Sequence, residues 1–103
     1  MDKIIYLGYQ YGSFEDEKSG RKVSYAHLFA MVEFDNPDNP DYHTDGYKGD
    51  KIPLKDTSVL KGLRLAPLDV IEVYYDKKGK VTKIVPVENA SAEDWMEEKS
   101  EVA

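Results

Sequence analysis

The sequence contains no cysteine among its 103 residues, so it can form no disulfide bond, thiolate nucleophile or cysteine-ligated metal site. It also lacks any apolar run near the roughly 18 residues that a membrane-spanning helix needs. Its first residues include no long apolar segment followed by a small-residue cleavage site. We therefore expect one cytoplasmic domain with no membrane partner, stabilised by a packed core.

Residues that carry catalysis or bind cofactors are scarce as well. The chain has two histidines, His27 and His43, and neither lies near a nucleophile motif. The glycines form no phosphate-binding loop between a strand and a helix. Asp41–Gly46 resembles the start of a calcium loop, but Ile52 stands where the bidentate Glu belongs. The sequence therefore predicts no enzyme activity, no cofactor and no metal site.

Negative charge gathers at the C-terminal end of the chain. The whole sequence has 20 acidic and 14 basic residues, a net charge of −6. Six acids and one lysine lie between Glu88 and Ala103, so residues 1–87 carry a net charge of only −1. We interpret residues 1–87 as a nearly neutral folded body and residues 88–103 as an acidic tail, either disordered or a short helix that starts at Ser91.

The body is rich in β-branched and aromatic residues grouped between turn signals. The predicted elements are strands at 4–14 and 23–34, an exposed loop at 35–50, a short strand at 51–55, a short helix at 56–62 and strands at 68–75 and 81–87. The first two and the last two strands form hairpins. Five strands with one short helix before the fourth predict an all-β fold, a small OB-like barrel, because closure removes exposed sheet edges.

The first hairpin carries the candidate binding surface. With a turn centred on Ser19-Gly20 and no bulge, strict alternation assigns one apolar face to the core. That predicted core face comprises Ile5, Leu7, Tyr9, Tyr11, Ala26, Leu28, Ala30, Val32 and Phe34. The opposite face mixes rings, glycines and polar groups, a pattern that suits the stacking of unpaired bases. Partial burial of both faces in a twisted barrel, or a protein interface, would explain the same pattern.

We predict that this second face binds nucleic acid by stacking, while nearby basic residues contact phosphates. The predicted stacking residues are Tyr6, Phe14, Tyr25 and Phe29, with Gln10 and His27 as hydrogen-bonding groups. The predicted phosphate contacts are Lys18, Arg21, Lys22, Lys48 and Lys51.

Tyr6–Phe14, Val23–Phe29 and Leu68–Val85 together resemble a known family in the order and character of their elements. The family is the small single-stranded-DNA-binding OB-fold proteins of filamentous phages and other mobile elements, the gene V type, and the likeness covers residues 3–87. The resemblance implies a homodimer that coats single strands cooperatively. It also implies that a protruding loop after the second strand contributes, which adds Tyr42 and Tyr47 beside Lys48.

The acidic tail resembles the tails with which bacterial single-strand-binding proteins recruit partners. This second resemblance implies that Trp95 and Met96 contact a partner protein. A solvated tail without a specific role is the competing interpretation.

The sequence therefore predicts a non-catalytic protein that binds single-stranded nucleic acid, DNA in the first place, in a phage, plasmid or integrative element. The choice between DNA and RNA stays open, because stacking tolerates either sugar. The alternative is a small β-barrel module for protein–protein interaction or regulation, in which the same aromatic face contacts another protein. A purely structural accessory domain is a third, weaker interpretation.

Overall fold

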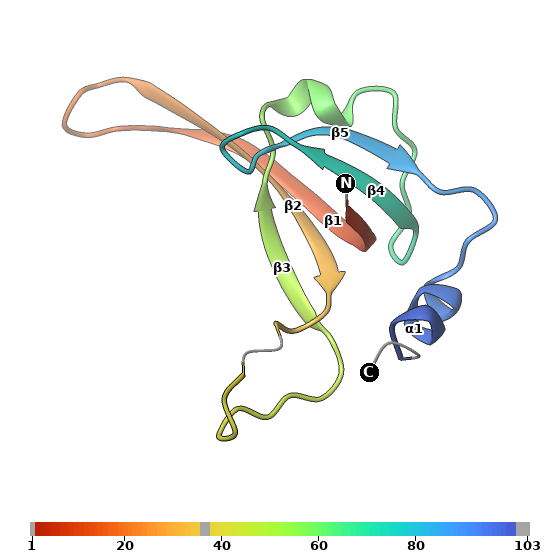
Figure 1. The fold of residues 1–103 in the computed structure, drawn as a ribbon. Helices are drawn as coiled ribbons and strands as arrows, with labels where there is room; N and C mark the ends of the chain where they lie inside the picture. The colour runs from red at the N-terminus through yellow and green to blue at the C-terminus, as the bar shows by residue number, and fades with distance from the viewer. Residues whose placement is uncertain (1, 36–37, 101–103) are drawn as a thin grey trace.

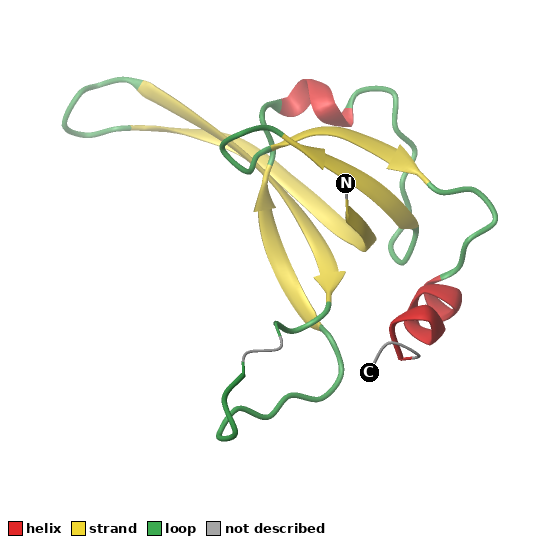
Figure 2. Cartoon of the chain, in the orientation of Figure 1, coloured by secondary structure: helices red, strands yellow, loops and turns green. Residues whose placement is uncertain are grey.

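The computed structural model describes residues 2–35 and 38–100. Its main element is a five-stranded antiparallel sheet with the spatial order β3-β2-β1-β4-β5 (Figures 1 and 2). The elements are β1 (Asp2–Glu15), β2 (Lys22–Val32), β3 (Lys48–Pro53), the 3-10 helix η1 (Thr57–Leu60), β4 (Val70–Tyr75), β5 (Val81–Pro86) and α1 (Ala92–Ser100). Neither helix in this described part of the chain is long and apolar enough to cross a membrane.

The five strands, the two hairpins and the short helix before β4 are confirmed, but the sheet is not closed into a barrel. The edge strands β3 and β5 meet at one parallel bridge between Leu54 and Val81, where the Lys55 N–H donates to the Val81 carbonyl at 2.9 Å. Asp56 then caps η1 by accepting the Ser58 N–H at 2.9 Å. The chain therefore turns away from β5 directly after the bridge, and no ladder forms between the two edges.

A β-bulge at Leu7 changes which face each residue of β1 occupies. Tyr6 pairs with Ala30 and Gly8 pairs with Phe29, so Leu7 is an additional residue without a partner. Tyr6 consequently lies on the core face, where it is only 4% exposed. The predicted role of Tyr6 in stacking bases is therefore wrong, because strict alternation assumes a strand without a bulge.

The β1–β2 hairpin extends beyond the strands that flank it. The predicted register pairs Gln10 with Phe29, whereas in the structure Gln10 pairs with His27. A shift of two residues keeps the residues beyond the bulge on their predicted faces. Because β4 pairs only with residues 2–5 and β3 only with residues 27–32, most of the segment 9–27 projects beyond the other strands (Figure 1), and we call residues 9–27 the arm. Partly for this reason the radius of gyration is 16.1 Å, above the ~13 Å of a compact 100-residue domain.

Two hydrophobic clusters lie on opposite faces of the sheet. The main cluster comprises Ile4, Tyr6, Leu28, Ala30, Ile52, Leu54, Ile71, Val73, Val81 and Ile84. The second cluster comprises Ile5, Val70 and Trp95. Ile5 and Val70 are neighbours of Ile4 and Ile71 in sequence, and alternation places them on the other side of β1 and β4. Helix α1 thus covers the second face of the sheet around Ile5 and Val70.

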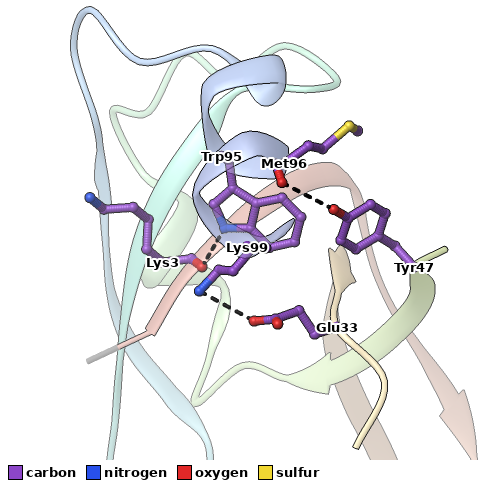
Figure 3. A network of polar contacts seen from close by, with 6 residues as sticks. All are labelled: Lys3, Glu33, Tyr47, Trp95, Met96 and Lys99. Atoms are coloured by element: carbon purple, nitrogen blue, oxygen red, sulfur yellow. Dashed lines mark hydrogen bonds and ion pairs between the residues drawn. The ribbon is translucent and has the colours of Figure 1, made fainter. Parts of the chain in front are cut away.

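Helix α1 is fixed to the sheet by its tryptophan (Figure 3). The Trp95 side chain is 3% exposed, and its indole Nε1–H donates to the Lys3 carbonyl at 2.9 Å. At the start of the helix, the Asp94 N–H donates to Ser91 Oγ at 3.1 Å and the Ser91 N–H donates back to the Asp94 carboxylate at 3.4 Å. Of the two alternatives for this segment, a disordered tail and a short helix that starts at Ser91, the structure thus has the helix with its capping box.

The loop before β3 also contacts α1 (Figure 3). The Tyr47 and Trp95 ring centroids lie 5.1 Å apart, and the Tyr47 hydroxyl donates to the Met96 carbonyl at 3.4 Å. Lys99 lies 3.3 Å from the Glu33 carboxylate. Trp95 is therefore docked on the sheet as an internal packing residue, and its buried side chain is not accessible to the partner protein that the second resemblance implies. Met96 is half-buried against the same cluster.

Replacement of Trp95 by alanine tests the docking of α1. We expect Trp95→Ala to lower the free energy of unfolding by about 3–5 kcal/mol, because a buried aromatic side chain is lost and its cavity remains. Trp95→Phe keeps a ring and loses the indole hydrogen bond, so its cost is smaller. Urea unfolding followed by far-UV circular dichroism measures both variants. An unchanged free energy for Trp95→Ala would show that α1 does not pack on the sheet.

Candidate functional site

One face of the arm carries a row of accessible rings. The centroids of Phe14 and Tyr25 lie 6.4 Å apart, and those of Tyr25 and His27 lie 5.9 Å apart. The Gln10 amide nitrogen lies 3.3 Å from His27 Nδ1. Phe14 and Tyr25 are exposed, and His27 is partly exposed. The arm thus presents planar groups at nearly regular intervals together with hydrogen-bonding side chains.

Gly12 makes room for the central ring of this row. Gly12 pairs directly with Tyr25 across the hairpin. A Cβ atom at position 12 would lie 2.6 Å from the Tyr25 hydroxyl oxygen and 2.9 Å from the ring carbon that carries it. The glycine therefore lets the Tyr25 ring lie flat across β1. Gly8 on the same strand has no neighbouring atom within 4 Å of such a Cβ.

An open groove of about 750 Å³ lies between the arm, the end of β3 and the turn that joins β4 to β5. Lysines from three separate segments line it: Lys22 in β2, Lys55 after β3 and Lys80 before β5. Tyr25 and Tyr11 contribute rings. Asp56 is the one acidic residue among the described residues that line this groove. The groove therefore combines positive charge with aromatic surface.

Two acids next to the groove, Asp56 and Asp76, accept hydrogen bonds within their own turns. The Asp56 carboxylate accepts the hydroxyl and the N–H of Ser58, and these bonds lower its pKa. The Asp76 carboxylate accepts the N–H groups of Lys80 at 3.0 Å and Lys78 at 2.9 Å, which lowers its pKa too. Each carboxylate thus fixes a turn close to a groove lysine, and its charge is partly offset by nearby N–H dipoles.

The arm tip is built in the same way. The Asp16 carboxylate accepts the Lys18 N–H at 3.1 Å and the Ser19 hydroxyl at 3.0 Å. Gly20 has a φ of +70°, a left-handed conformation that glycine adopts without strain. Lys18 and Arg21 are both exposed at this tip. The tip therefore presents two cations beyond the ring row, next to the exposed acids Glu15 and Glu17.

Most of the predicted site residues fall on the arm or next to it. The arm carries Gln10, Phe14, Lys18, Arg21, Lys22, Tyr25 and His27. Phe29 follows one step inward on the same face of β2, where it is half-buried and pairs with exposed Lys51 of β3. These nine residues share one region of the sheet, and this grouping defines the candidate site.

The other predicted residues lie elsewhere. Tyr6 is in the core, and Trp95 of α1 packs against the second face of the sheet. Tyr47 packs on Trp95, and Lys48 lies 4.0 Å from Asp35. Tyr42 is exposed in the loop between β2 and β3, which Figure 1 shows at the end of these strands away from the arm tip. The structure therefore does not bring the loop residues together with the ring row.

Four residues near the site were not predicted to belong to it. Tyr9 and Tyr11, assigned to the core by alternation, are 52% and 60% exposed because no strand or helix fully covers the arm. Lys55 and Lys80 lie far apart in sequence, and the bridge between Leu54 and Val81 brings their segments together. No local pattern could have shown that contact. The run of tyrosines in an unusually long hairpin was the available signal for Tyr9 and Tyr11.

Comparisons with known proteins found no relative of this chain. No family model, curated protein or solved structure matches the chain. The resemblance to gene V-type proteins therefore stays a hypothesis based on element order. In residues 2–35 and 38–100, no group of three or more His, Asp or Glu side chains is arranged to hold a metal ion.

Substitution of Gly12 tests the geometry of the ring row. We expect Gly12→Ala to push the Tyr25 ring off β1, because the new methyl group and the hydroxyl cannot share the same space. Gly8→Ala is the matched control and should leave the ring in place. Nuclear Overhauser contacts between the Tyr25 and His27 rings provide the measurement. If these contacts survive in Gly12→Ala, the ring does not lie across position 12.

Proposed function

We propose that this chain is a non-catalytic protein that binds single-stranded nucleic acid, DNA in the first place, along the ring row and the adjoining groove. The observation that carries the proposal is the exposed row of Phe14, Tyr25 and His27 beside a groove lined by three lysines. Each base stacked on an aromatic side chain contributes about 1–3 kcal/mol of binding free energy. The lysines, which come from three different segments, are suited to successive phosphates.

We further propose that the sheet is an incomplete OB-like barrel. The element order and the single bridge between Leu54 and Val81, where β3 and β5 would join, support this interpretation. OB-folds bind oligonucleotides on the face of strands 2 and 3, between the loops that follow strands 1 and 4. The groove lies between the corresponding segments of this chain, the arm and the turn at residues 76–80.

The acidic net charge is compatible with a polyanionic ligand because the charges are separated in space. Helix α1 carries Glu93, Asp94, Glu97 and Glu98, and Figure 1 shows it at the opposite end of the molecule from the arm. The Debye length is about 10 Å at 0.1 M salt. At that ionic strength the repulsion from α1 is strongly screened at the groove, where the local charge is positive.

A titration with fluorescent oligo-dT and a matching duplex, at about 50 mM and 200 mM salt, tests this function. We expect saturable binding to the single strand and weaker binding to the duplex. If the three groove lysines each meet one phosphate, the log–log salt slope is about −2, and Lys80→Ala reduces it by about 0.7. Oligo-U in place of oligo-dT measures the preference between DNA and RNA. Absence of binding at low salt would instead favour the protein-interaction module.

Removal of one ring tests the stacking itself. We expect Tyr25→Ala to weaken oligo-dT binding by about 5- to 150-fold, the equivalent of one stacked base. Val23→Ala is the control, because Val23 pairs with Phe14 on the same face and offers apolar surface without a ring. The affinity of Val23→Ala for oligo-dT should stay within about twofold of that of the unaltered protein, because this variant removes no stacking ring. Equal losses in both variants would mean that apolar area, rather than stacking, drives binding.

A further inference from the structure

The opposite face of the arm carries a second pair of rings, Tyr9 and Tyr11, of which only Tyr11 lines the lysine groove. Tyr9 and Tyr11 lie on the face of β1 that holds Ile4 and Tyr6 in the core, at the point where the strand leaves the core. Their centroids are 6.0 Å apart and their planes differ by 5°. More than half of each side chain is exposed. Parallel, exposed rings offer faces against which planar groups can stack.

This pair of rings adjoins the lysine groove directly. Tyr11 and Thr57 line both the groove and a second hollow of about 490 Å³. Tyr9 and Leu60 line both that second hollow and a third of about 200 Å³. The three hollows therefore follow one another along the inner face of β1, with η1 and the segment after it on the other side.

Basic residues accompany the rings along the same path. Lys61 lines the second hollow and Arg64 lines the third, and none of the described residues that line these two hollows is acidic. Gly62 lies between them in sequence with a φ of +77°, a left-handed conformation that glycine adopts without strain. The path thus alternates aromatic and cationic groups, which complements a chain of bases joined by phosphates better than it complements a peptide.

We propose that Tyr9 and Tyr11, with Lys61 and Arg64, form a second stacking subsite that receives the continuation of a single strand bound in the groove. This inference rests on the proposed function and extends it, because it sets the course of the strand. A strand that occupies only the groove needs a few nucleotides, whereas one that also reaches this subsite needs more. Affinity should therefore depend on oligonucleotide length, and the second subsite should account for that dependence.

The experiment compares two lengths of oligo-dT, about 4 and about 16 nucleotides, the limits of OB-fold site sizes. The variant Tyr9→Ala, whose ring lies outside the lysine groove, is expected to bind the long oligonucleotide about fivefold or more weakly than the unaltered protein, and the short one within about twofold. The control Tyr9→Phe keeps the ring and should behave like the unaltered protein. Blue-shifted fluorescence of the single, buried Trp95 verifies that each variant is folded.

The outcomes separate this inference from the function on which it rests. If the alanine variant binds both lengths as the unaltered protein does, the second subsite is wrong while single-strand binding stands. If it loses affinity equally for both lengths, the Tyr9 ring belongs to the first site and a separate subsite is again wrong. If the unaltered protein binds neither length, the proposed function fails and the inference fails with it. Tyr25→Ala should weaken the binding of both oligonucleotide lengths, because Tyr25 belongs to the groove end of the path.

Discussion

The single extra residue at Leu7 is the constraint on which the rest of the structure depends. Before the bulge, Tyr6 faces the main core and Ile5 faces Trp95; after it, odd-numbered residues take over the core side. Without the bulge, the core side of β1 would continue as Gly8, Gln10 and Gly12. The bulge instead carries Tyr9 and Tyr11 onto that side and leaves the glycines opposite. Both faces of the arm consequently present aromatic rings.

Helix α1 gives the acidic end of the chain a structural role. Its tryptophan covers the second cluster on the sheet, and its acids lie away from the arm. Near the groove, Asp56 and Asp76 hydrogen-bond to N–H groups of their own turns, which leaves the lysines of those segments as the dominant charges. The net charge of the whole chain is therefore a poor guide to the surface around the arm, because opposite charges occupy opposite ends of the molecule.

Features that depend on neighbouring residues could be predicted well. The hairpin of the last two strands, the short helix within 56–62 and the helical alternative that starts at Ser91 all depend on local hydrogen-bonding side chains in the turns and caps. The first hairpin was also predicted, and the two-residue error in its register left the faces of the arm unchanged. The ring row of Phe14, Tyr25 and His27 could be identified for this reason, because period-two alternation holds within the arm.

The amino-acid sequence by itself thus determined the strands, the turns and one face of the arm, since these depend on contacts between residues near in sequence or directly paired. The fold alone brought Lys55 beside Lys80, moved Tyr6 into the core, left Tyr9 and Tyr11 exposed, and buried Trp95 against Ile5. Each of these outcomes depends on where a strand bulges, where a sheet ends or which segment covers it. Such features arise from packing among distant segments, and no local pattern in the chain encodes them.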